Sequence, residues 1–156
     1  MRPARIPIGL HLAQATRLVS RAFDDALAAA GGSLPVWLVL LNIKTQQLAN
    51  QRELAEAVGI REATLTHHLN AMEADGLITR QRHEANRRIH VVRLTDAGEA
   101  TFVRLAGAAV AFDQQLRRGF NDPELAALGD VLDRLAANVG GANAGLPWAG
   151  LAEDTR

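Results

Sequence analysis

The chain has 156 residues, of which 48% are hydrophobic, so it is long and apolar enough to form one compact subunit with a sizeable core. It has no cysteine, which excludes disulfides, thiol-based redox sensing and thiolate metal sites. It also lacks a run of about 18 apolar residues and an N-terminal signal-like apolar segment, so we expect a cytoplasmic protein that does not span a membrane.

Two helices are predicted in the first third of the chain. Residues 1–7 contain two prolines and should form an extended arm, after which a long helix from about Ile8 to Ala30 carries its apolar residues on one stripe. The glycine pair at 31–32 ends this helix, and Ser33 is positioned to cap the next one. That second helix is apolar almost all round from Val36 to Leu41, so it should be buried between other helices.

A helix, a tight turn and a second helix are predicted between residues 50 and 75. The first begins at Asn50, which can form a capping box with Glu53, and it ends at Gly59, which supplies the left-handed backbone for a sharp turn. The second begins at about Glu62, and the apolar residues that it should bury have the spacing i, i+4, i+7: Leu65, Leu69 and Met72. Its opposite face carries small or hydrogen-bonding residues suited to a major groove, namely Ala63, His67 and Asn70, flanked by Thr64 and Thr66.

A basic β-hairpin is predicted next. Segments 77–82 and 89–95 are rich in β-forming residues and flank a polar stretch, while Leu48 and Ala49 are candidates for a third short strand. Between residues 76 and 95 the only acid is Glu84, whereas the bases are Arg80, Arg82, Arg87, Arg88 and Arg93. This net charge of +4 makes phosphate the natural counterpart. The formal charge of zero thus conceals a segregation: residues 1–50 carry +3, residues 51–95 carry +1 and residues 96–156 carry −4.

The last part of the chain predicts two helices that need a partner. Thr95 is positioned to cap a helix that continues to about Arg118, and the sequence Asn121-Asp122-Pro123 opens another that extends to about Val139. Both helices, like the first one of the chain, carry apolar stripes that one small lobe cannot cover. We therefore expect a helical dimerisation region at 8–47 and 96–139, a DNA-binding region at 48–95 and a mobile tail at 140–156.

The order of these elements decides how each is interpreted. Taken alone, five arginines on a hairpin are more often a solvated face than a nucleic-acid contact, and the stripe of leucines and methionine is ordinary core. Two helices joined at a glycine and followed at once by a basic hairpin are, however, a winged helix-turn-helix, mainly α with a small β-wing. Some winged helices serve as protein-interaction or chromosome-architecture modules without an effector, and that is the alternative interpretation.

The sequence predicts neither an enzyme nor a cofactor. It contains no Gly-rich phosphate loop, no paired carboxylates in an apolar setting and no serine placed beside a histidine with an orienting group. His67 and His68 are adjacent, so their side chains point about 100° apart on a helix and cannot chelate one metal ion as an i, i+4 pair can. We therefore expect no metal site.

From residue 51 to residue 98 the chain reads QRELAEAVGIREATLTHHLNAMEADGLITRQRHEANRRIHVVRLTDAG, which resembles the multiple antibiotic resistance regulator (MarR) family of bacterial transcription factors. The resemblance extends over residues 8–139. Its most specific pieces are Thr64-Leu65-Thr66, the EADGL segment at 73–77, Arg87-Arg88, and Leu94-Thr95 with Gly98. The chain departs from the family at Asn86, where an aspartate usually precedes the two wing arginines, so a neutral hydrogen bond replaces any ion pair there.

The resemblance implies a homodimer with interleaved first and last helices, and a mostly repressive regulator released from a pseudo-palindromic operator by a small, often aromatic or phenolic, ligand. That ligand would bind between the dimerisation helices and the DNA-binding lobe, where the candidates are His11, Trp37 and Leu41. Ordinary core packing or dimer contact is nevertheless the commoner role of such residues. The residues expected to contact double-stranded DNA are Arg61, Ala63, Thr64, Thr66, His67, His68, Asn70, Arg80, Arg82, Arg87 and Arg88.

Overall fold

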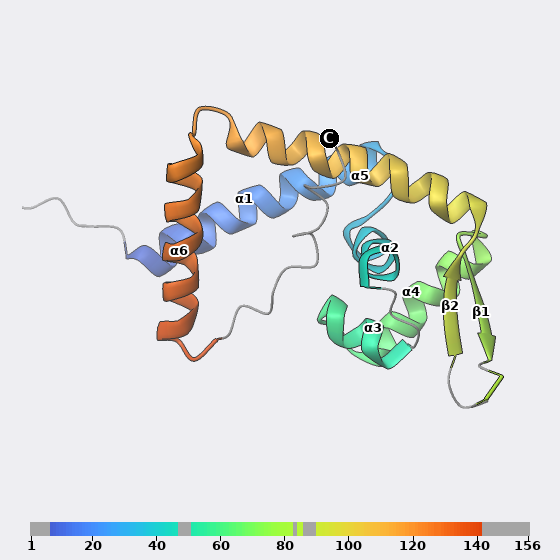
Figure 1. The fold of residues 1–156 in the computed structure, drawn as a ribbon. Helices are drawn as coiled ribbons and strands as arrows, with labels where there is room; N and C mark the ends of the chain where they lie inside the picture. The colour runs from blue at the N-terminus through green and yellow to red at the C-terminus, as the bar shows by residue number, and fades with distance from the viewer. Residues whose placement is uncertain (1–6, 47–50, 83, 86–89, 142–156) are drawn as a thin grey trace, which may run out of the picture.

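A computed structural model of the chain describes residues 7–46, 51–82, 84–85 and 90–141, and the contacts below refer to these residues. It is mainly helical with one antiparallel two-stranded sheet, which confirms the predicted fold class. The elements shown in Figure 1 are α1 (Ile8–Ala29), α2 (Leu34–Gln46), α3 (Gln51–Val58), α4 (Glu62–Ala74), β1 (Ile78–Arg82), β2 (His90–Leu94), α5 (Asp96–Arg117) and α6 (Asp122–Asn138). The predicted cap Asn50 and the predicted strand at Leu48 and Ala49 lie outside the described residues. In the described part of the chain no single helix is long and apolar enough to span a membrane, and α1 and α2 meet that test only as a pair bent by 78°.

Helix α2 lies at the centre of the protomer. It packs against α1, α3, α4, α5 and β2, and its residues Val39, Leu40 and Leu41 are completely buried. The ring of Trp37 stacks on that of Phe102 from α5, with 5.7 Å between the ring centroids. The prediction that this helix is buried between other helices is therefore confirmed.

The long helices α1 and α5 lie side by side (Figure 1). Phe23 of α1 stacks on Phe112 of α5 with 5.0 Å between the ring centroids. Nε of Arg104 in α5 donates to the carbonyl oxygen of Ala30 at 3.0 Å, which satisfies a backbone acceptor just beyond α1. These contacts hold the C-terminal part of α1, whereas every residue of the helix before Phe23 is exposed in the protomer.

A compact junction joins α4, the hairpin and α5 at Thr95. Its hydroxyl oxygen accepts a hydrogen bond from the backbone N–H of Gly98 at 3.1 Å, which confirms Thr95 as the N-cap of α5. The same hydroxyl donates to the carbonyl oxygen of Gly76 at 2.5 Å, and the backbone N–H of Thr95 donates to the carbonyl oxygen of Leu77 at 3.0 Å. One residue therefore ties the turn after α4 to the end of β2 and the start of α5.

Helix α6 begins with a complete capping box. Asn121 Oδ1 accepts from the backbone N–H of Glu124, and the carboxylate of Glu124 accepts from the backbone N–H of Asn121, each at 2.9 Å, with Pro123 in the first turn as predicted. The helix projects from the far end of α5, away from α3, α4 and the hairpin (Figure 1). Each of its residues is exposed or half-buried, so its apolar side chains face solvent in a single protomer.

Candidate nucleic-acid interface

Helices α3 and α4 form a helix-turn-helix at Gly59. This glycine has a φ of 76°, and the backbone N–H groups of Gly59 and Ile60 both donate to the carbonyl oxygen of Ala55, at 2.9 and 3.1 Å, which closes α3. The residues that α4 buries are the predicted ones: Leu65, Leu69 and Met72. The predicted core face of α4 is confirmed, and its opposite face is open.

The open face of α4 carries most of the residues that we expected to contact bases. Five of them are exposed on this face, on its flank or just before the helix: Arg61, Ala63, Thr64, His67 and Asn70. Thr66 and His68 are half-buried, because they lie on the flanks of the helix nearer to the buried stripe. The seven residues are therefore not equivalent, and the five exposed ones are best placed to contact a nucleic acid.

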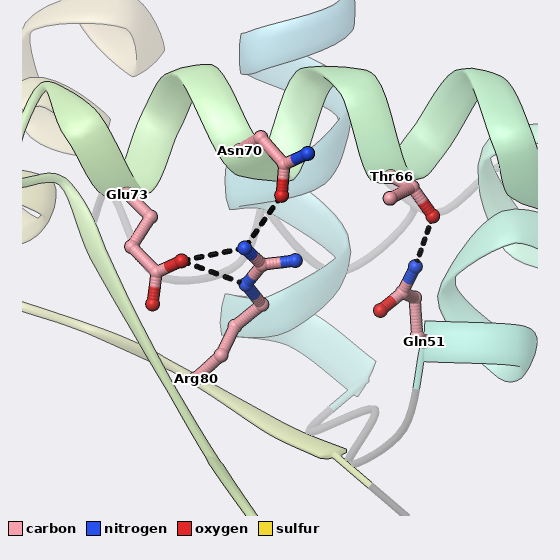
Figure 2. A network of polar contacts seen from close by, with 5 residues as sticks. All are labelled: Gln51, Thr66, Asn70, Glu73 and Arg80. Atoms are coloured by element: carbon pink, nitrogen blue, oxygen red, sulfur yellow. Dashed lines mark hydrogen bonds and ion pairs between the residues drawn. The ribbon is translucent and has the colours of Figure 1, made fainter.

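Thr66 is held by two other protein groups, of which Figure 2 shows Gln51. Its hydroxyl donates to the carbonyl oxygen of Glu62 at 2.8 Å and accepts from Nε2 of Gln51, the first residue of α3, at 2.5 Å. A threonine hydroxyl has one proton, and here that proton is committed inside α4. Thr66 thus fastens the start of α3 to α4, and towards DNA it offers only acceptor capacity.

Arg80 of β1 turns back onto α4 (Figure 2). Its Nε and Nη2 donate to Oε2 of Glu73 at 3.0 and 2.5 Å, and Nη2 also donates to Oδ1 of Asn70 at 2.6 Å. The Arg80 side chain is only 19% exposed. Because α4 compensates the charge of this arginine, the +4 counted along the hairpin overstates the positive charge that is free to meet phosphate.

The register of the hairpin explains where Arg80 points. Arg80 pairs with Val92 across the two strands, and residues directly opposite each other in an antiparallel pair share one face. Ile78, two residues before Arg80 on the same strand, shares this face, and both Ile78 and Val92 are buried. Arg80 therefore lies on the face turned toward α4, whereas Arg93, which pairs with Thr79, lies on the outer face.

Gln51 and Glu73 belong to this surface but were not predicted. Glu73 stands three residues after Asn70 and seven after Thr66, so the three lie along one flank of α4. The inward and outward alternation of residues along β1 would have aimed Arg80 at that flank. Gln51 has no comparable sequence signal, since its contact depends on how α3 packs against α4.

The other hairpin arginines fall into two groups. Arg82, on the same face of β1 as Arg80 but at the end of the strand, is exposed, and so is Arg93. Their guanidinium groups offer several N–H donors with a permanent charge, which suits phosphate oxygens. Arg87 and Arg88, also predicted to contact DNA, lie outside the described residues.

The three residues predicted to contact a small ligand lie in different surroundings within the chain. Trp37 and Leu41 are buried in the core, and Trp37 packs on Phe102. His11 is exposed near the start of α1, sixteen residues before Leu27, the buried residue that anchors the helix. Because an α-helix rises about 1.5 Å per residue, His11 lies roughly 24 Å from Leu27 along the axis of α1.

Comparisons with known proteins agree with this architecture. The family model described as MarR family matches residues 33–90. Transcriptional regulator PA3341, a solved structure, is 30% identical to this chain, with a TM-score of 0.71 over 86% of this chain and 98% of that chain. The transcriptional repressor CouR, solved bound to a 23-mer DNA duplex, is 28% identical, with a TM-score of 0.71 over 83% of this chain and 92% of that chain.

A third solved structure extends the likeness of fold. PcaV from Streptomyces coelicolor, in complex with its natural ligand, is 22% identical, with a TM-score of 0.71 over 86% of this chain and 97% of that chain. The helix-turn-helix, the basic hairpin and the flanking long helices are thus matched over nearly the whole length of a regulator 30% identical in sequence. This chain belongs to the MarR family of transcriptional regulators.

Proposed function

We propose that this protein is a homodimeric repressor that binds a pseudo-palindromic operator in double-stranded DNA and acts by binding rather than by catalysis. The observation that carries this proposal is the open face of α4, which stands opposite the buried Leu65, Leu69 and Met72. The major groove, about 12 Å wide, admits one α-helix. The binding of CouR, 28% identical to this chain, to a DNA duplex supports the same role for α4 here.

In this proposal α4 contacts the bases and the hairpin contacts the phosphates. Thr64, His67 and Asn70 face base edges in the major groove, which is where sequence is read. The exposed Arg82 and Arg93 bind phosphate, which sets the position and orientation of the protein without sequence preference. The target is chromosomal DNA, so we place the protein in the cytoplasm of a bacterial cell.

The dimer is proposed because one protomer leaves much apolar surface uncovered. The large exposed apolar residues of α1 and α6 include Ile8, Leu10, Leu18, Leu128, Val131 and Leu132. Leu128, Val131 and Leu132 share one face of α6, and large exposed apolar patches are rare on monomeric proteins. We propose that residues 8–47 and 96–139 form the dimerisation region, and that the two copies of α4 then reach two half-sites.

A footprint on the DNA upstream of the protein's own gene tests the function. The dimer should protect a pseudo-palindrome whose half-site centres lie one helical turn, about 34 to 36 Å, apart. Adding the protein to an in vitro transcription reaction on that DNA should lower the yield of transcript. Binding with no preferred sequence would favour the chromosome-architecture alternative, and higher transcript yield would make the protein an activator.

A small ligand of the aromatic or phenolic class that the family resemblance implies is proposed as the signal that releases the operator. The sequence resemblance and the fold shared with the ligand-bound PcaV support this, although at 22% identity that second likeness extends to the fold alone. A ligand releases DNA only if it prefers the DNA-incompetent arrangement of the dimer. A tenfold preference shifts the equilibrium by about 1.4 kcal/mol at each site.

Titration with aromatic carboxylates and phenols, following operator release and tryptophan fluorescence together, tests this part of the proposal. We expect release to accompany the fluorescence change, with Trp37→Phe removing the signal of the buried tryptophan. Ligand affinity unchanged in both Trp37→Phe and His11→Ala would remove these residues from the pocket. Failure of every ligand to release DNA would favour a constitutive repressor.

A further inference from the structure

The orientation of the Asn70 side-chain amide is determined by its hydrogen bond with Arg80. A guanidinium group has only hydrogen-bond donors, so the amide atom 2.6 Å from Nη2 of Arg80 must be the carbonyl oxygen. This removes the usual ambiguity between the oxygen and nitrogen of an asparagine side chain. The amide N–H2 group of Asn70, on the exposed side of α4, has no hydrogen-bond partner among the described residues and can bind another molecule (Figure 2).

We propose that Arg80 is a positioning residue for sequence recognition: it holds Asn70 by its oxygen, so that Asn70 reads a base as a hydrogen-bond donor. The proposal rests on the proposed function, since it requires α4 to enter the major groove. It assigns to Arg80 a role different from the phosphate contact that the sequence indicated.

Arg80 can hold Asn70 because Arg80 is itself fixed. Glu73 receives two of its N–H donors, at 3.0 and 2.5 Å, and only 19% of the Arg80 side chain is exposed. Asn70 and Glu73 are three residues apart on one flank of α4, so a single guanidinium reaches both (Figure 2). A base-reading side chain locked by its neighbours binds DNA with a smaller loss of rotamer freedom than a free one.

The preferred base follows from which amide atoms are available. A free asparagine pairs with adenine by accepting from N6–H2 and donating to N7. In this chain the carbonyl oxygen already accepts from Arg80, so the bidentate pairing with adenine would require the same oxygen to accept a second hydrogen bond, from N6–H2, close to a positive charge. The remaining N–H2 group fits the acceptors O6 and N7 of guanine or O4 of thymine, whereas adenine offers it only N7, with the N6–H2 donor beside it. We therefore expect guanine or thymine, rather than adenine, at the position that Asn70 reads.

A phosphate contact and a positioning role predict different behaviour. Loss of a phosphate contact weakens binding to every sequence and lowers the salt dependence, whereas loss of positioning changes the preference at one base position. Arg82 and Arg93 are matched comparisons, because Arg82 lies on the same face of the hairpin and Arg93 on the outer face, and both are exposed. Replacing any of the three arginines with alanine removes the same charge.

The experiment is selection of bound sequences from operators randomised one position at a time, with the full-length dimer. In the wild-type protein, one position in each half-site should prefer guanine or thymine, and Asn70→Ala should abolish that preference. Arg80→Ala should lower the preference over adenine at this position by about fivefold or more, the lower end of what one base contact contributes. Arg82→Ala and Arg93→Ala should weaken binding uniformly and leave the preference unchanged.

Glu73→Gln is the second variant, and it keeps the Arg80 side chain intact. Removing the negative charge should tighten binding to all DNA, because it leaves one more free positive charge on the surface, while the preference at the Asn70 position falls. If Arg80 were a phosphate contact, Glu73→Gln would tighten binding with the base preference unchanged.

Three results would overturn the inference. Uniform weakening by Arg80→Ala with an unchanged base profile would make Arg80 a phosphate contact. A preference for adenine at the position lost in Asn70→Ala would contradict the donor role of Asn70. A wild-type protein that selects no sequence at all would overturn the proposed function itself, which separates that failure from the other two.

Discussion

Gly98→Ala should lower the free energy of unfolding by about 3 kcal/mol, because the junction at the start of α5 has no room for a methyl group. A Cβ built on Gly98 would lie 2.0 Å from the carbonyl oxygen of Leu77 and 3.5 Å from Cβ of Leu94. The obstructing oxygen is a backbone atom that already accepts the N–H of Thr95 at 3.0 Å. It cannot swing aside like the end of a side chain, so the first turn of α5 must shift and this hydrogen bond weakens.

Chemical denaturation at one fixed protein concentration measures the change, since the stability of the proposed dimer would depend on concentration. Gly107→Ala is the matched control in the same helix, because a Cβ there meets nothing within 4 Å. Its better helix propensity should raise the free energy of unfolding by up to about 1 kcal/mol. Wild-type stability in Gly98→Ala would show that the junction relaxes without cost and would contradict the prediction.

Gly98→Ala should also weaken DNA binding. Thr95 holds the carbonyl oxygens of Gly76 and Leu77, and these residues connect α4 to β1. A shift at the start of α5 therefore changes the angle between α4 and the hairpin. This change would disturb the hydrogen bond from Arg80 on β1 to Asn70 on α4. We expect the variant to lose operator affinity at temperatures where it is still folded.

Most elements could be predicted because local signals set their boundaries. Gly59 adopts the left-handed backbone expected at the end of α3, and Thr95 caps α5 through its side chain. Helices α1 and α4 end at Ala29 and Ala74, each one residue earlier than expected, which is within the range over which a last helical turn frays. A turn glycine, an N-cap threonine and the spacing of apolar residues are each signals within a few residues of sequence. They can therefore be recognised without knowledge of the tertiary structure.

The partners of the polar side chains could not be predicted in the same way. Arg80 was counted with four other arginines as free charge, although Glu73 on the preceding helix neutralises it. This contact crosses the turn at Gly76, and its existence depends on the angle at which the hairpin leaves α4. The ligand candidates show the same limit. The burial of Trp37 could be predicted from the apolar residues of its helix, whereas the exposure of His11 depends on how α1 packs against the rest of the chain.

Leu132→Asp should convert the proposed dimer into a monomer at micromolar concentration. Every residue of α6 is exposed or half-buried in the protomer, and Leu132 is 37% exposed, on the same side of the helix as Leu128. A helix of 17 residues that packs against little is marginally stable in water, so its order requires apolar contact with another surface. A second copy supplies that surface in the proposed dimer, and a carboxylate placed there would be buried without a partner.

Light scattering and far-ultraviolet circular dichroism should report the loss of mass and of part of the helix signal together. Operator affinity should fall by about a hundredfold or more, because the two half-sites are then bound by separate protomers rather than by linked ones. Ala126→Asp is the matched control: it adds the same charge to the exposed side of α6 away from Leu132, and it should remain a dimer. If Leu132→Asp left mass and operator affinity unchanged, the dimer contact would not involve this face of α6. If the wild-type protein were monomeric and protected only one half-site, there would be no dimer.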